Sequence, residues 1–147
     1  MCLLARQIDE IVDKEDVVCY KIVYYDEDRG VYVAPHMGTT IKKECIDGSE
    51  PYNALGTPDV FQWGVCIYKI ESGFIHTYAK KENAVKALTF LRKREEGRYA
   101  NHGYYELYEC IIPAGTKYYA GYYEDFENAI YNSYASTSIT FKEKLCV

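Results

Sequence analysis

Two side chains in the middle of the sequence, Cys66 and His76, could together perform covalent chemistry. A cysteine thiolate is a nucleophile, and a histidine within hydrogen-bond reach can act as its base. The two residues flank residues 71–73, whose types are typical of a turn, so the strands around that turn could bring them face to face. Cysteine inside an apolar strand is usually inert. The pair therefore gives an enzyme as one hypothesis, and no catalytic residue is assigned.

Tyrosine is the most unusual component of the composition, with 17 of 147 residues. Most of these rings suit the half-buried surface of a sheet, where the ring packs and the hydroxyl stays in water. A tyrosine also offers flat, rigid contact area that can stack on a base or a sugar. We expect this second role in the last third of the chain, where Tyr118, Tyr119, Tyr122 and Tyr123 lie in or beside predicted loops. The predicted ligand-binding residues are His76, Tyr78, Lys117, Tyr118, Tyr119, Tyr122, Tyr123, Ser136 and Ser138.

Other common kinds of site have no signature in the sequence. The six cysteines include no C-x-x-C pair and the three histidines are far apart, so we predict no metal site. Neither of the glycine-rich phosphate-binding motifs occurs, and we predict no cofactor. The net charge of −5 argues against binding to nucleic acid or to an anionic membrane. RNA binding stays a remote alternative because of one basic group, Arg92, Lys93, Arg94 and Arg98.

The length and composition predict one domain spanning residues 1–147. The chain is 48% hydrophobic and 27% charged, which is enough apolar surface to build a core. No apolar run is long enough to cross a membrane, and residues 1–7 become polar too soon for a signal peptide. We therefore expect a soluble, unexported protein of the cytoplasm whose cysteines are thiols.

Strand-forming runs and turn residues alternate along most of the chain, with one strong helical pattern. Ala84, Val85, Ala87, Leu88 and Leu91 form one apolar stripe, which predicts a helix over about 81–96. We predict an α+β fold in which a curved or partly closed, mainly antiparallel sheet packs against this one long helix. The other predictions are a short helix over 9–16, strands at 17–25, 31–34, 39–43, 60–70 (bent at Gly64), 74–78, 104–112, 116–119 and 136–141, and an irregular segment between the last two strands.

Several segments together resemble small proteins encoded by phages and mobile elements of gut bacteria. The resemblance spans most of the chain and brings no assigned activity. It implies an accessory role in the contest between phage and host, inside the bacterial cell. The segments are Cys19-Tyr20-Lys21-Ile22-Val23, Val33-Ala34-Pro35, Gly73-Phe74-Ile75-His76-Thr77-Tyr78 with a following helix that contains Glu82 and Ala84, residues 112–121, and Tyr134-Ala135-Ser136-Thr137-Ser138-Ile139.

Three functions from different classes remain open at this point. The favoured one is a non-enzymatic protein that captures a small polar ligand, in particular a nucleotide signal, because the tyrosines and the resemblance both fit it. The first alternative is a protein-interaction module whose tyrosine-rich surface contacts a host protein or a second copy of the chain. The second alternative is an enzyme that uses Cys66 or His76, which requires a cleft holding both side chains.

Overall fold

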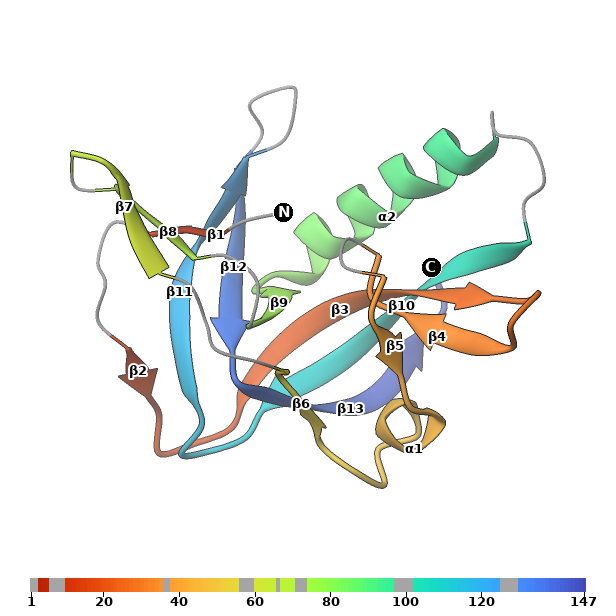
Figure 1. The fold of residues 1–147 in the computed structure, drawn as a ribbon, viewed down its shortest axis with the longest axis horizontal. Helices are drawn as coiled ribbons and strands as arrows, with labels where there is room; N and C mark the ends of the chain where they lie inside the picture. Colours follow the sequence, from red (N-terminus) through yellow and green to blue (C-terminus); the bar gives the residue numbers. More distant parts are fainter. Residues whose placement is uncertain are drawn as a thin grey trace.

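The computed structural model describes residues 3–5, 10–35, 38–55, 60–65, 67–70, 74–96, 102–124 and 130–147. The strands in this part of the chain pair with one another in antiparallel fashion and form a curled sheet, which carries two helices (Figure 1). The predicted α+β class and the mainly antiparallel sheet are therefore confirmed. The one long helix of the prediction is α2 (Lys81–Glu96), and the structure adds a short helix, α1 (Lys43–Ile46), that was not predicted.

The sheet has thirteen described strands, ten of which follow one another in the order β6-β13-β10-β3-β9-β12-β11-β1-β8-β7. Off this path, β2 pairs with β11, and β4 pairs with β3 and β5. The strands are β1 (Leu3–Ala5), β2 (Ile11–Val12), β3 (Val17–Asp26), β4 (Val31–Val33), β5 (Thr40–Ile41), β6 (Tyr52–Asn53), β7 (Val60–Gly64), β8 (Ile67–Ile70), β9 (Ile75–Tyr78), β10 (Gly103–Ile112), β11 (Lys117–Glu124), β12 (Ile130–Ser136) and β13 (Ser138–Leu145).

The two longest strands, β3 and β10, pair over their full length, from Val17 opposite Ile112 to Asp26 opposite Gly103. Successive side chains point to opposite faces of a strand, so the pair supplies apolar residues to both sides of the sheet. Ile22 and Leu107 belong to a first hydrophobic cluster, with Tyr78 and Tyr123 among its members. A second cluster on the other face contains Cys19, Val23, Tyr108, Cys110 and Phe141.

Helix α2 covers part of the first face of the sheet, beside β3 and β10 in Figure 1. Its charges suit the helix dipole, with Glu82 in the first turn and Lys93 and Arg94 in the last. Ala84 and Leu88 are fully buried in the first cluster, as the apolar stripe predicts. The predicted bounds of this helix are confirmed. Among the described residues, no helix has both the length and the apolar composition needed to cross a bilayer.

Several local predictions agree with the structure and several do not. The hairpin of β3 and β4 is confirmed, as are a strand within 39–43 and the strand before Pro113. The predicted helix over 9–16 is wrong in the described residues, where β2 and a loop stand instead. The predicted long strand over 60–70 is two strands, β7 and β8, whose pairing register shifts between Gln62 and Gly64. Gly64 was the expected site of distortion.

The last third is more regular than predicted. Strand β11 continues to Glu124, and β12 begins at Ile130, where an irregular segment was expected. The two pair from Tyr118 opposite Ser136 to Glu124 opposite Ile130. Strand β1 lies against the other side of β11, where a β-carbon at Gly121 would overlap the backbone oxygen of Leu4. Only glycine lets the two backbones approach this closely.

We predict that Leu88→Ala lowers the free energy of unfolding by about 2–5 kcal/mol, because it empties a fully buried position between α2 and the sheet. Phe90→Ala is the matched control, since the Phe90 side chain is exposed and its loss should change stability by less than about 0.5 kcal/mol. Urea unfolding followed by circular dichroism measures both. Equal effects of the two substitutions would contradict the packing of α2 on the first cluster.

Candidate functional site

Strands β3 and β9 are neighbours in the sheet but pair at one point only, Tyr20 opposite Tyr78. Beyond that point the strands separate, and β9 continues its pairing with β12. Lys21 follows Tyr20 on β3, and its Nζ donates a hydrogen bond of 3.0 Å to the backbone oxygen of His76 on β9. In the described pairing, no backbone N–H of β3 lies opposite the His76 carbonyl. The Lys21 ammonium therefore supplies the hydrogen bond that this carbonyl needs.

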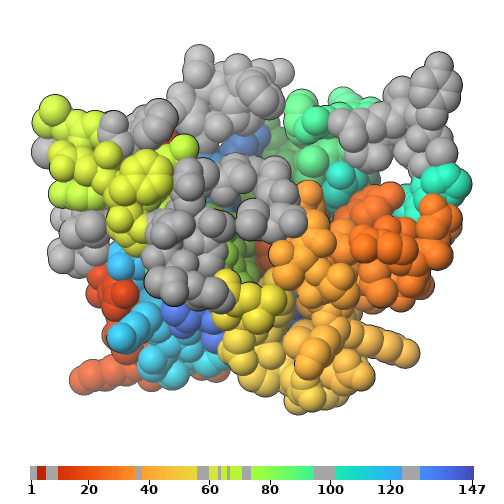
Figure 2. Space-filling model, viewed as in Figure 1, coloured from red at the N-terminus to blue at the C-terminus, as the bar shows by residue number. Residues whose placement is uncertain are grey.

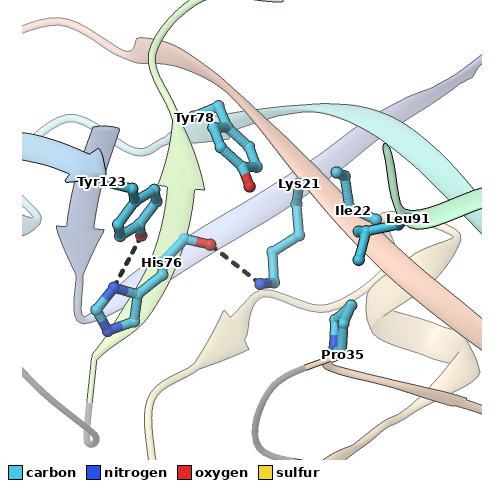
Figure 3. A pocket seen from close by; sticks show the side chains of 7 residues that line it. All are labelled: Lys21, Ile22, Pro35, His76, Tyr78, Leu91 and Tyr123. Carbon is cyan, nitrogen blue, oxygen red and sulfur yellow. Dashed lines mark hydrogen bonds between the residues drawn. The ribbon is translucent and has the colours of Figure 1, made fainter. Parts of the chain in front are cut away.

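A small cavity lies where the two strands separate. We call it the lysine cavity. It holds about 40 Å³, is open on one side, and is lined by Lys21, Ile22, Pro35, His76, Tyr78, Leu91 and Tyr123 (Figure 3). By strand alternation Lys21 belongs to the second face of the sheet, whereas His76, Tyr78 and Tyr123 belong to the first. The four side chains meet because the gap between β3 and β9 connects the two faces.

Lys21 is the most unusual group in this cavity. Only 9% of the residue is exposed, although lysine is almost never buried without a partner. An ammonium has three N–H donors, and the one acceptor found among the described residues is the His76 oxygen. No described carboxylate forms an ion pair with it. Burial lowers the pKa of Lys21 from 10.5 to about 8, against smaller opposing effects of Cys110 and Cys19.

The opposite wall of the lysine cavity is a set of aromatic rings in mutual contact. His76 Nδ1 and the Tyr123 hydroxyl share a hydrogen bond of 2.8 Å, and the two rings lie 5.8 Å apart. Tyr78 meets Tyr123 edge to face at 5.6 Å and Tyr131 at 6.1 Å. Burial raises the pKa of Tyr78, so its hydroxyl stays protonated at neutral pH. These contacts fix the wall before any ligand binds.

The comparisons with known proteins assign the chain to no family. No family model, no curated protein and no solved structure matches it. The site is therefore interpreted from its own geometry. In the part of the chain that the structure describes, no three histidine, cysteine, aspartate or glutamate side chains are grouped so that they could hold a metal ion.

Three of the predicted ligand-binding residues, His76, Tyr78 and Tyr123, line the lysine cavity. Lys117, Tyr118 and Tyr119 lie at the start of β11, beside residues 10–16, which we call the acidic segment. There the Tyr118 hydroxyl donates to Asp13, the Tyr119 hydroxyl donates to Glu10 at 3.2 Å, and Lys117 Nζ lies 3.9 Å from a Glu10 oxygen. These contacts explain the two tyrosines as links between β11 and the acidic segment.

The four tyrosines that were expected in or beside loops all lie within strand β11, with Tyr118 and Tyr119 near its start and Tyr122 and Tyr123 near its end. Tyr122 is half-buried and stands opposite Leu4 of β1. Ser136 is fully buried at the end of β12, and its Oγ has no hydrogen-bond partner among the described residues. Ser138 pairs with Asn53 of β6. The predicted residues therefore do not gather in one place.

The hairpin that was expected to bring Cys66 and His76 face to face is not formed by the described strands. The strands on either side of residues 71–73 do not form a hairpin, because β8 pairs with β1 and β7 whereas β9 pairs with β3 and β12. The His76 ring bonds to Tyr123 instead, and its backbone oxygen accepts from Lys21. Cys66 itself lies outside the described residues. Four other cysteines, Cys19, Cys45, Cys110 and Cys146, are free thiols.

A second, larger hollow of about 570 Å³ is a less suitable site. It is a wide, open depression lined by residues 12–17. Two of its three acidic side chains already have partners within the protein, since Asp13 accepts from Tyr118 and Asp16 accepts from the backbone N–H of Ala114 at 2.9 Å. The lysine cavity is better suited because the ammonium of Lys21 has more donors than the described residues offer acceptors.

Sequence reasoning missed Lys21, although a signal was present. Lys21 stands between Cys19 and Val23 on the same face of a strand whose other residues, apart from the last one, Asp26, are apolar or aromatic. A charged residue at such an inward position breaks the binary pattern, and breaks of this kind are expected at functional sites. The sequence held no sign that β9 would lie beside this lysine.

We predict that Lys21→Met removes a characteristic pH dependence of stability. A lowered pKa in the folded state means that the unfolded chain binds the proton more tightly between about pH 8 and pH 10.5, so native stability rises with pH in that window. The shift of 10.5 − 8 corresponds to about 3 kcal/mol. Wild type should therefore gain about that amount relative to Lys21→Met between pH 7 and pH 10.5. Urea unfolding at intervals of one pH unit measures it, and parallel curves would contradict the buried ammonium.

Proposed function

We propose that the protein binds a small anionic ligand, whose charged group enters the lysine cavity and meets Lys21, and releases it unchanged. The observation that carries this proposal is the buried ammonium of Lys21, which has one described acceptor for three donors. An uncompensated buried charge is costly, and an anion beside it would offset that cost through charge-assisted hydrogen bonds. The preformed aromatic wall supports binding because little of the site needs to be ordered by the ligand.

The size of the lysine cavity limits the ligand class. About 40 Å³ is room for a few water molecules or for one carboxylate or phosphate group. Pockets that enclose a whole drug-sized ligand hold roughly 300–1,000 Å³. A nucleotide signal therefore fits the proposal through its phosphate, with the base and sugar outside the described walls. Capture of such a signal in the cytoplasm of a bacterial host also agrees with the resemblance to phage-encoded accessory proteins.

A second candidate function has its own observation. The tip formed by β3, β4 and the start of β10 makes up the right-hand edge in Figure 1, and the orange atoms of β3 and β4 lie at the surface on the same side in Figure 2. It carries three tyrosine rings in contact. Tyr25 lies 4.9 Å from Tyr32 and 5.4 Å from Tyr104, and 46% of Tyr104 is exposed. Exposed aromatic residues are enriched at protein interfaces. This supports the interaction module, with a second copy of the chain as the first partner to test.

We predict that phosphate or a nucleoside monophosphate stabilises the wild-type protein. At a ligand concentration of about 100 Kd the gain is about 2.7 kcal/mol, or roughly 5–10 °C in Tm. Lys21→Met should abolish the shift because it removes the cation. Lys117→Met is the control, since Lys117 is an exposed lysine that was itself predicted to bind ligand. The affinity should fall above about pH 8, as Lys21 loses its proton.

The two lysine variants show which of the two lysines binds the ligand. Loss of the shift in Lys117→Met but not in Lys21→Met would move the site to the start of β11 and overturn the proposal. No shift with inorganic phosphate, acetate, nucleoside monophosphates or cyclic nucleotides would do the same. Mass spectrometry of the ligand recovered after denaturation decides between binding and turnover, and we expect the ligand unchanged.

For the second candidate, we predict that the wild-type protein self-associates and that Tyr104→Ser weakens the association by at least about tenfold, because it removes an exposed interface aromatic. Sedimentation velocity over a range of protein concentrations measures it. Val65→Ser, at an exposed apolar residue next to β7, is the control and should change nothing. A wild-type protein that stays monomeric at high concentration would rule out this mode of association.

A further inference from the structure

We propose that Lys21 is also a covalent site for small carbonyl compounds, aldehydes or 2-oxo acids, with which its amine forms an imine inside the lysine cavity. This inference uses the same cavity as the proposed function. It requires the neutral amine, however, whereas anion binding requires the ammonium. The two activities can therefore succeed or fail independently.

The position of Nζ supports this reactivity. The side chain of Lys21 extends from β3 into the space between His76 and Pro35 (Figure 3), where the bond to the His76 oxygen holds Nζ in place. Ile22 and Leu91 line the cavity on the same side as α2 and keep it largely apolar. A lysine in apolar surroundings is the usual form of an activated amine nucleophile. The volume of about 40 Å³ admits a carbonyl group with one or two further carbons.

The groups that face Lys21 leave its amine available near neutral pH. They are Cys19 on its own strand, Cys110 on β10, His76 and Tyr78 on β9, and Tyr123 on β11. No carboxylate among the described residues forms an ion pair with Nζ that would hold the proton. With a pKa of about 8, half of the Lys21 side chains are neutral at pH 8. An ordinary lysine is neutral in only roughly 0.3% of molecules at that pH.

The bonded pair of His76 and Tyr123 can serve the proton transfers that the reaction needs. The neutral Nζ attacks the carbonyl carbon, and the π electrons of the carbonyl move to its oxygen. A proton moves from nitrogen to that oxygen and gives a carbinolamine. The pair then donates a proton to the hydroxyl, which leaves as water while the nitrogen lone pair forms the C=N bond. Loss of the last N–H proton back to the pair leaves an imine and one water, with no oxidant or reductant used.

The test is reductive trapping on the whole chain. The protein is incubated at about pH 8 with glyoxylate and cyanoborohydride, which converts an imine to a stable secondary amine, and labelled peptides are quantified by mass spectrometry over time. We expect Lys21 to be labelled at least about tenfold faster than the exposed Lys117, with a rate that levels off above about pH 8. Formaldehyde, the smallest carbonyl compound, serves as a second probe. Circular dichroism confirms that the protein stays folded.

Labelling of Lys21 at a rate equal to or below that of Lys117 with both probes would overturn the inference. Tyr123→Phe, which keeps the ring but loses the hydroxyl bonded to His76, should slow the labelling of Lys21 without moving its pH midpoint. An unchanged labelling rate in that variant would show that the His76–Tyr123 pair takes no part in the proton transfers. Added phosphate separates this inference from the proposed function. Labelling that phosphate does not slow would support the imine site and contradict anion binding, whereas a phosphate-induced rise in Tm without labelling would do the reverse.

Discussion

The hydrogen bond from Lys21 Nζ to the His76 oxygen joins two halves of one sheet at their weakest point. In the described strand order, β6-β13-β10-β3 lies on one side and β9-β12-β11-β1-β8-β7 on the other. A single register pair, Tyr20 opposite Tyr78, connects them. Because the backbones then diverge, a side chain has to satisfy the exposed carbonyl, and the gap remains as a cavity. The candidate site is thus a direct result of where the sheet stops pairing.

The same divergence explains why a charge can persist in the interior. A lysine on a fully paired strand would face the second hydrophobic cluster beside Cys19 and Val23, where burial of its ammonium is unfavourable. At the gap, the stem of the side chain packs among apolar residues and its head reaches a carbonyl and an opening to solvent. Burial still disfavours the charged form of Lys21, and this lowers its pKa. The buried ammonium of Lys21 lowers the stability of the fold and at the same time offers a group that can bind or react. Such a trade-off is common at functional sites.

The tyrosines divide between structure and site according to their neighbours. Tyr119 packs edge to face on Phe74, and Tyr118 packs in the same way on Tyr134, both at 5.4 Å, while their hydroxyls bind carboxylates. Tyr78 and Tyr123 use the same ring contacts to form a cavity wall. The abundance of tyrosine therefore indicated half-buried sheet surfaces correctly, whereas the four tyrosines of β11 do not share one surrounding.

By itself, the sequence determined the features that short-range patterns encode. The stripe through Ala84 and Leu88 defined α2, and the β-branched and aromatic runs around the turn before Val31 defined the hairpin of β3 and β4. Tertiary structure alone decided that β9 lies beside β3 and not beside β8, and so that Lys21 meets His76 across 55 residues of sequence. The physical reason is that alternation along a strand specifies which face is buried, whereas the choice of a distant partner depends on how all the faces pack together.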